Sequence, residues 1–166
     1  MTVEELNLPK NESLDDFVKR NEIRQKLFEN VEVWTQQYCD AITQNYKEYH
    51  VRMLERNLSG DHPEYAQQQL DEIKNGTAKL MKFEIKEGKK YYKIVQMEFD
   101  TYQNRNEYRE GSVHSFVDKN TGDVYKPASW RSPAKHVRFT FQKPEDIRFL
   151  LNPFNVTWTG GYLYMR

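Results

Sequence analysis

The spacing of apolar residues divides the chain into two parts with different periods. In the first part they recur at steps of three and four, which is the spacing of one face of an α-helix. Ser13 followed by Asp16 is typical of a capped helix start, and Gly60 ends the pattern. The stripe predicts one long helix, or two helices with a break near Asn30. Its members are Phe17, Ile23, Leu27, Val31, Trp34, Tyr38, Ala41, Ile42, Tyr49 and Met53.

A second helix and then a change of period follow. Pro63 suits the first turn of a helix over residues 64–74, and Asn75-Gly76 suits its end. After Gly76 apolar and polar residues alternate, which is typical of strands with one buried face. Asn and Gly within Asp118–Asp123 tolerate the backbone of a tight turn and predict a hairpin there. The expected strands are 81–86, 91–99, 113–117 and 124–126.

The rest of the second part is more polar. Residues 100–111 are predicted to form an exposed loop, and residues 128–132, between two prolines, an irregular segment or a helical turn. Phe139 and Phe141 alternate with polar neighbours, and a short helix is expected near 144–151, where the sequence opens with Pro-Glu-Asp. Residues 162–165 are expected to add a last strand. The fold class is therefore α+β, with N-terminal helices packed on a C-terminal antiparallel β-meander.

Composition narrows the class of protein. The 166 residues suit a single domain over 1–166, mainly helical over 1–76 and mainly β over 77–166. Aromatic residues make up 14% of the chain, which argues against intrinsic disorder. No apolar run approaches the roughly 20 residues of a membrane span, and residues 1–10 lack the apolar stretch of a signal peptide. We therefore expect a soluble protein, with no membrane partner, in the cytoplasm.

Charge is balanced overall but not along the chain. Residues 1–80 carry 10 Lys and Arg against 15 Asp and Glu, and residues 81–166 carry 15 against 10. The sharpest local feature is the segment Lys126–Arg138, which has no acidic residue. Lysine and arginine neutralise phosphates, and a tryptophan can stack on a base. The candidate ligand-binding residues are Lys126, Trp130, Arg131, Lys135, His136 and Arg138.

Two structural interpretations compete with this functional one. Trp130 can instead be a core anchor between the hairpin and the C-terminal helix, because tryptophan is usually packed. Rings on the strands can form a stacking platform near Lys89, Lys90 and Lys93, or one sheet face can simply pack on the helices. Since one face must be buried, at most half of these rings can be exposed. The platform candidates are Tyr91, Tyr92, Tyr102, Tyr108, Phe116 and Tyr125.

The sequence contains no catalytic or metal-binding signature. Four histidines are scattered without ligand spacing, and the single Cys39 excludes a cysteine-based zinc site and an internal disulfide. His114-Ser115 has the wrong spacing for the paired motifs of phosphoesterases. We therefore expect no metal and no cofactor, and a non-enzymatic role, with an unrecognised enzyme left as an alternative.

One segment carries a resemblance to a known group of proteins. Residues 118–126 read DKNTGDVYK, followed by ASW at 128–130 and PAK at 133–135. This segment resembles a family of small uncharacterised proteins from tailed bacteriophages. The resemblance implies a phage origin, and hence the host cytoplasm, but it supplies no activity and no catalytic residues.

The favoured function is thus a phage accessory protein that binds a phosphate-bearing ligand, namely nucleic acid, through the basic segment. The main alternative is an antagonist of a host defence or replication protein, which would use the N-terminal helices as its interface. The wide apolar stripe of those helices also allows a homodimer. A virion component is a third possibility.

Overall fold

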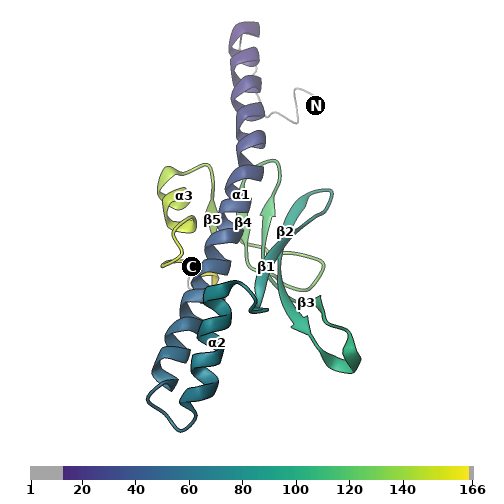
Figure 1. The fold of residues 1–166 in the computed structure, drawn as a ribbon. Coiled ribbons are helices and arrows are strands. Elements are labelled where there is room, and N and C mark those ends of the chain that lie inside the picture. The colour runs from purple at the N-terminus through teal and green to yellow at the C-terminus, as the bar shows by residue number, and fades with distance from the viewer. Residues whose placement is uncertain (1–12, 165–166) are drawn as a thin grey trace.

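A long helix lies across one face of an antiparallel sheet (Figure 1). The computed structural model describes residues 13–164 of the chain. The sheet has five strands whose spatial order is their order in the sequence. This arrangement confirms the predicted α+β fold with a β-meander. The strands are β1 (Lys82–Glu87), β2 (Tyr91–Asp100), β3 (Glu107–Asp118), β4 (Asp123–Tyr125) and β5 (Phe139–Thr140).

Helix α1 (Leu14–Asn57) is continuous, without the break considered near Asn30. Ser13 caps it as predicted, because its Oγ accepts a hydrogen bond from the Asp16 N–H at 3.2 Å. The first turns project beyond the sheet (Figure 1), and Leu14 and Ile23 are 77% and 67% exposed there. We call residues 13–30 the arm. From Val31 onward one side of the helix is buried, so the apolar stripe becomes core where the sheet lies beneath it.

Helix α2 (Pro63–Asn75) packs beside the C-terminal part of α1 (Figure 1). It begins at the predicted proline and ends at Gly76, whose φ of 81° is a left-handed conformation that favours glycine. The predicted second helix is confirmed.

Two expectations about the second half were wrong. The polar segment 100–111 is not all loop, because β3 already begins at Glu107, which pairs with Asp100. Its connection to β2 contains a 3₁₀ turn, η1 (Tyr102–Asn104). A second 3₁₀ turn, η2 (Gly161–Leu163), forms where the strand over 162–165 was expected, and residue 165 lies outside the described residues. Leu163 is buried in the core, so packing determines this segment rather than pairing with a strand.

The core lies between the sheet and α1. Side chains from every strand enter it, as do residues of α3 (Pro144–Leu150), the predicted short helix, and of the segment that follows. Asn45 on α1 fixes that segment, because its side chain donates to the Pro153 carbonyl and accepts from the Trp158 N–H. We call this side of the sheet the inner face and the opposite side the outer face. Inner-face residues include Phe83, Tyr92, Ile94, Val117, Val124 and Phe139.

Candidate nucleic-acid interface

The outer face carries aromatic and basic side chains from three neighbouring strands. Successive side chains in a strand alternate between faces, so Tyr91 and Lys93 lie opposite the inner-face Tyr92 and Ile94. Phe116 on β3 pairs with Lys93 on one side and with Tyr125 on the other. The Tyr91 ring meets the rings of Phe116 at 5.8 Å and Tyr125 at 6.1 Å between centroids. Three rings and one ammonium group therefore form a contiguous cluster.

The basic segment is the loop between β4 and β5, and its own hydrogen bonds brace it. A β-bridge pairs Pro127 with Pro133, and the Ala134 N–H donates to the Lys126 carbonyl at 2.8 Å. At the tip, the N–H groups of Ala128 and Ser129 donate to the Ser132 carbonyl. Because these bonds already exist without a ligand, less conformational entropy is lost when the loop binds one.

Trp130 connects the tip of this loop to the outer face. The Lys93 Nζ lies 4.4 Å from the centroid of the Trp130 ring, within the range of a cation–π interaction. The same ammonium group lies 5.8 Å from the Phe116 ring. Trp130 remains 40% exposed, so it is neither enclosed in the core nor detached from the sheet. It lies at the boundary between the protein and solvent.

The other residues of the basic segment take different positions. Arg131, Lys135 and His136 are exposed. Lys126 is half-buried, with its Nζ 4.6 Å from the centroid of the Tyr164 ring. Arg138 is also half-buried, and its N–H donates to the Val124 carbonyl, so it belongs to the start of the β4–β5 pairing. The exposed cations thus lie on the outer part of the loop, and Lys126 and Arg138 at its two ends.

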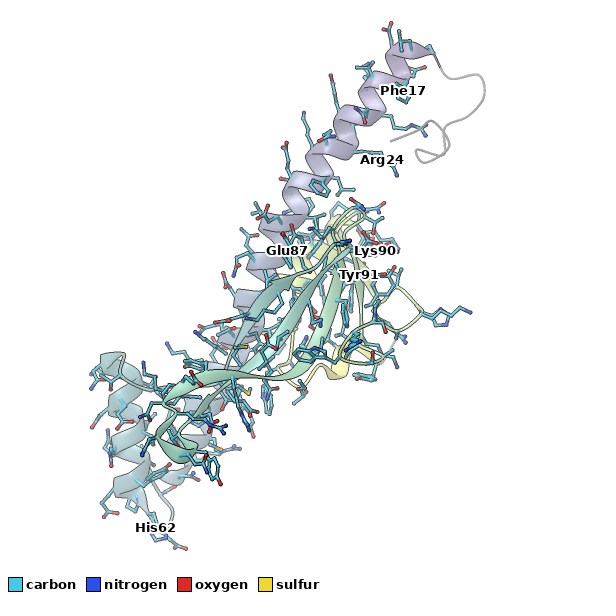
Figure 2. The ribbon with its side chains drawn as sticks, turned by 90° about the vertical axis from the view of Figure 1, so that its right-hand side faces the viewer. Phe17, Arg24, His62, Glu87, Lys90 and Tyr91 are labelled. Carbon is cyan, nitrogen blue, oxygen red and sulfur yellow. The ribbon has the colours of Figure 1, made fainter. Side chains whose placement is uncertain are left out.

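The predicted stacking platform is brought together only in part. Tyr92 lies on the inner face, and Tyr102 and Tyr108 lie toward the far end of the β2–β3 hairpin. Phe116 belongs to the cluster but is only 1% exposed, so its ring is not available to a ligand. The rings that reach solvent at this site are Tyr91, Tyr125 and Trp130. Lys90 lies 5.3 Å from the Tyr91 ring, and both residues lie at the end of the sheet near the β1–β2 turn (Figure 2).

Sequence reasoning did not identify two of the contacts. Lys93 was noted for its position beside strand tyrosines, but its contact with Trp130 joins residues on different elements. Tyr164, under Lys126, lies at the end of a 3₁₀ turn where the sequence predicts a strand. No local pattern in the sequence signals either contact, because both depend on where the β4–β5 loop folds back.

The inner face holds a series of buried, hydrogen-bonded polar side chains that resembles a catalytic site. The Nδ1 of His114 lies 3.1 Å from the Ser115 Oγ, and its Nε2 lies 3.2 Å from the Thr157 carbonyl oxygen. A carbonyl only accepts, so Nε2 carries the proton and Nδ1 accepts from the serine hydroxyl. Tyr38 hydrogen-bonds both Ser115 and Tyr162.

These hydrogen-bonded side chains on the inner face are structural rather than catalytic. Burial lowers the pKa of His114 to about 4 and raises that of Tyr162 well above its ordinary value, so both remain neutral near pH 7. The His114 ring is packed against Phe83, Tyr38 and Tyr162, and it is buried away from solvent. A substrate therefore has no route to the His–Ser pair. Burial likewise raises the pKa of the Cys39 thiol to about 12, so it is unreactive.

Two further findings concern residues 13–164. Within that range no three His, Cys, Asp or Glu side chains are grouped as metal ligands. The helices of the same range include none with the length and apolarity needed to cross a bilayer.

The chain matches a known protein family. Residues 14–165 match the profile of a protein family described as a family of unknown function, DUF7717. No curated protein and no solved structure matches the chain. Because the match covers nearly the whole sequence, the chain belongs to the DUF7717 family.

Proposed function

We propose that the protein binds a phosphate-bearing ligand, with nucleic acid as the ligand class, through the outer face and the β4–β5 loop. The observation that carries the proposal is the position of Trp130. Its ring is 40% exposed and lies at the tip of a loop that contains basic residues and no acidic ones, with the Lys93 ammonium group over it. Such a combination of rings and cations is typical of surfaces that bind single strands.

Each part of the site has a physical role in this proposal. Arg131 and Lys135 are exposed and can neutralise phosphates, and an arginine can grip one through two hydrogen bonds. Trp130 and Tyr91 reach solvent, and stacking of unpaired bases on their rings would favour a single strand over a duplex. The braced loop keeps these groups in place before the ligand arrives.

The balanced charge of the chain sets the expected strength of binding. With 25 basic and 25 acidic residues, the protein has no general attraction for polyanions. Binding therefore depends on the local group of cations and is sensitive to salt. The resemblance to small tailed-phage proteins adds the setting to the proposal, namely an accessory protein that acts on nucleic acid in the host cytoplasm.

Fluorescence anisotropy with a labelled 20-nucleotide single strand tests the proposal. Arg131→Ala should weaken binding and lower the slope of log affinity against log salt by about 0.7 on a single strand for each lost phosphate contact. Trp130→Ala should weaken binding by about 1–3 kcal/mol if a base stacks on the ring. Lys74→Ala and Tyr65→Ala on α2 are matched controls, because both residues are exposed and lie on another element. Failure of the wild-type protein to bind at low salt would refute the proposal.

A second candidate function is binding of a host protein through the arm. The exposed apolar residues Leu14 and Ile23 favour it, because no other described element covers them. A pull-down from infected cells, with half of the sample treated with nuclease, separates the two functions. A host protein retained after nuclease supports the second candidate, whereas nucleic acid recovered from the untreated half supports the first. The mass of the purified protein in solution tests the predicted homodimer.

A further inference from the structure

Strand β1 lies at the edge of the sheet, and part of the backbone on its free side has no hydrogen-bond partner among the described residues. Within an antiparallel pair, backbone groups point alternately toward and away from the partner strand. The Gly88 N–H donates to the Tyr91 carbonyl at 2.9 Å, and the Phe83 N–H donates away from β2 to the Thr43 Oγ1 at 3.1 Å. Both bonds agree on which residues of β1 direct their backbone groups toward β2 and which direct them away from it. The backbone groups of Phe83, Ile85 and Glu87 therefore point away from β2, toward the side on which α1 lies.

α1 satisfies the N–H group of the first of these positions and neither backbone group of the other two. The Thr43 Oγ1 accepts a hydrogen bond from the Phe83 N–H. Among residues 13–164, no hydrogen-bond partner lies on that side of Ile85 or Glu87. An edge strand with unpaired N–H and C=O groups is a template for one more strand. The open stretch is thus two residues long, next to the β1–β2 turn.

A cavity lies beside this open stretch. Its volume is about 440 Å³, within the range of pockets that hold small ligands. Figure 2 shows Glu87 on the side of the sheet that adjoins α1. The lining consists of Glu32, Val33, Gln36 and Gln37 from α1 and of Ile85, Glu87 and Tyr92 from the strands.

We propose that this cavity binds an extended basic peptide, which adds to β1 as a further antiparallel strand. The open backbone groups of Ile85 and Glu87 supply the hydrogen bonds, as in other cases of strand addition. The peptide side chain opposite Ile85 points to the inner-face side, where Val33 is 53% exposed, so an apolar residue fits. This surface is separate from the outer-face site and does not depend on it.

Charge determines the neighbouring position. The peptide side chain opposite Glu87 meets the carboxylates of Glu87 and Glu32. Lys119 lies 3.7 Å from the Glu87 carboxylate, whereas Glu32 has no ion-pair partner within residues 13–164. A lysine or arginine of the peptide at this position can form an ion pair with the Glu32 carboxylate. Because the added strand runs antiparallel to β1, the basic residue comes two positions before the apolar one.

The same charges disfavour a second copy of the chain as the occupant. A symmetric dimer brings identical surfaces together, so two β1 edges would place Glu32 and Glu87 of one copy against those of the other. Like charges at such an edge oppose pairing. The occupant is therefore a peptide of opposite charge.

Amide hydrogen exchange of the full-length protein tests the proposal at single residues. The probe is a capped synthetic nonapeptide, Thr-Lys-Thr-Val-Thr-Lys-Thr-Val-Thr, and its control has Glu in place of Lys. Without peptide, the amides of Ile85 and Glu87 should exchange quickly and those of Glu84 and Lys86 slowly. Saturating probe should slow Ile85 and Glu87 by about tenfold or more and leave Glu84 and Lys86 unchanged. Unchanged exchange at both amides would overturn the proposal.

Two variants separate the backbone from the charge. Glu87→Pro removes an outward N–H without breaking the ladder to β2, and Glu87→Ala removes the same carboxylate but keeps the N–H. The proline variant should bind the probe about tenfold more weakly than the alanine variant. Equal affinity of the two variants would contradict strand addition, and melting of each variant shows whether the fold is kept.

Charge reversal provides a second pair. Glu32→Lys should weaken binding of the probe about tenfold and improve binding of the glutamate control, whereas Glu48→Lys, at an exposed position elsewhere on α1, should change neither. Indifference to Glu32→Lys would refute the basic character of the partner. Protection of Ile85 and Glu87 without any peptide, together with a mass of two chains, would show that a second copy occupies the edge and would also overturn the proposal.

Discussion

The two faces of the sheet both carry aromatic residues, but these residues have different surroundings. On the inner face, rings meet other rings and the buried His114, and α1 covers them. On the outer face, the Tyr91 ring meets the rings of Phe116 and Tyr125. Ammonium groups lie over the more exposed rings there, Lys93 over Trp130 and Lys90 over Tyr91. The outer rings lie under a loop rather than a helix, and several stay partly exposed. The element that covers an aromatic residue, rather than its type, thus separates core from candidate binding surface.

This difference predicts unequal tolerance to substitution. A residue packed on the inner face has no room to adjust, because interiors are as dense as organic crystals. A residue at the edge of the outer face can move into solvent. Changes to the inner face should therefore lower the free energy of unfolding, and changes to the exposed part of the outer face should alter binding.

The largest effect is expected at Gly122, where the hairpin turn meets the inner core. Its φ is 74°, and an added Cβ would lie 2.9 Å from the Phe141 Cβ and 3.2 Å from the Val31 Cγ2. Gly122→Val should therefore lower the free energy of unfolding by about 3 kcal/mol or more, from backbone strain and overpacking together. Gly76→Val is the control, because its φ is 81° but nothing lies within 4 Å of the added Cβ. Chemical denaturation should show a clearly smaller loss for Gly76→Val.

A pH dependence should arise from the inner face. The pKa of His114 is about 4 in the folded protein, below the ordinary value of 6.5. Between these values the unfolded chain binds a proton that the folded chain does not, so stability falls as pH drops from about 6.5 to about 4. The slope should be about 1.4 kcal/mol per pH unit. His114→Gln should remove most of it. A wild-type slope near zero would mean that His114 titrates normally.

Two tryptophans allow a direct comparison of the faces. Trp34 on α1 packs against the Phe141 ring at 5.7 Å between centroids, and Trp130 lies over Lys93. Trp34→Ala should lower the free energy of unfolding by about 3 kcal/mol. Trp130→Ala should lower it by about 1 kcal/mol, because it loses a cation–π contact and part of its burial. Equal losses, measured by denaturant titration, would show that the outer face is a second core.

The smallest effect is expected where α1 has no sheet beneath it. Ile23 in the arm is 67% exposed, so Ile23→Gln should change the free energy of unfolding of the monomer by less than about 0.5 kcal/mol. Ile42, at a fully buried position of the same helix, is the matched control, and Ile42→Gln should be strongly destabilising. A large effect of Ile23→Gln would show that the arm is covered in solution.

Periodicity was sufficient to predict most of the fold. The start of α1 at Ser13, the limits of α2 and the meander all follow from local patterns that packing does not oppose. The early start of β3 could not be predicted, because residues 107–111 continue the strand where no helix covers it and their side chains are largely polar. The final 3₁₀ turn escaped prediction for the opposite reason, since burial of Leu163 overrides the local preference.

The candidate site was predictable in composition but not in geometry. The basic residues around Trp130 stand together in the sequence, so the segment could be recognised. The contact between Trp130 and Lys93 could not, because it depends on the path of a loop over a sheet face. The need to bury one sheet face predicted that at most half of the platform rings can be exposed. It could not show which half.

The length of α1 has a consequence for the behaviour of the molecule in solution. At 1.5 Å per residue, its 44 residues span about 66 Å. A compact chain of this size has a radius of gyration of about 15 Å, so as a sphere it would be only about 40 Å across. The molecule therefore scatters and tumbles as a rod with a thickened middle, and its translational diffusion is slower than its mass suggests. A monomer of this shape elutes early in gel filtration, so its elution volume alone would suggest the mass of a dimer.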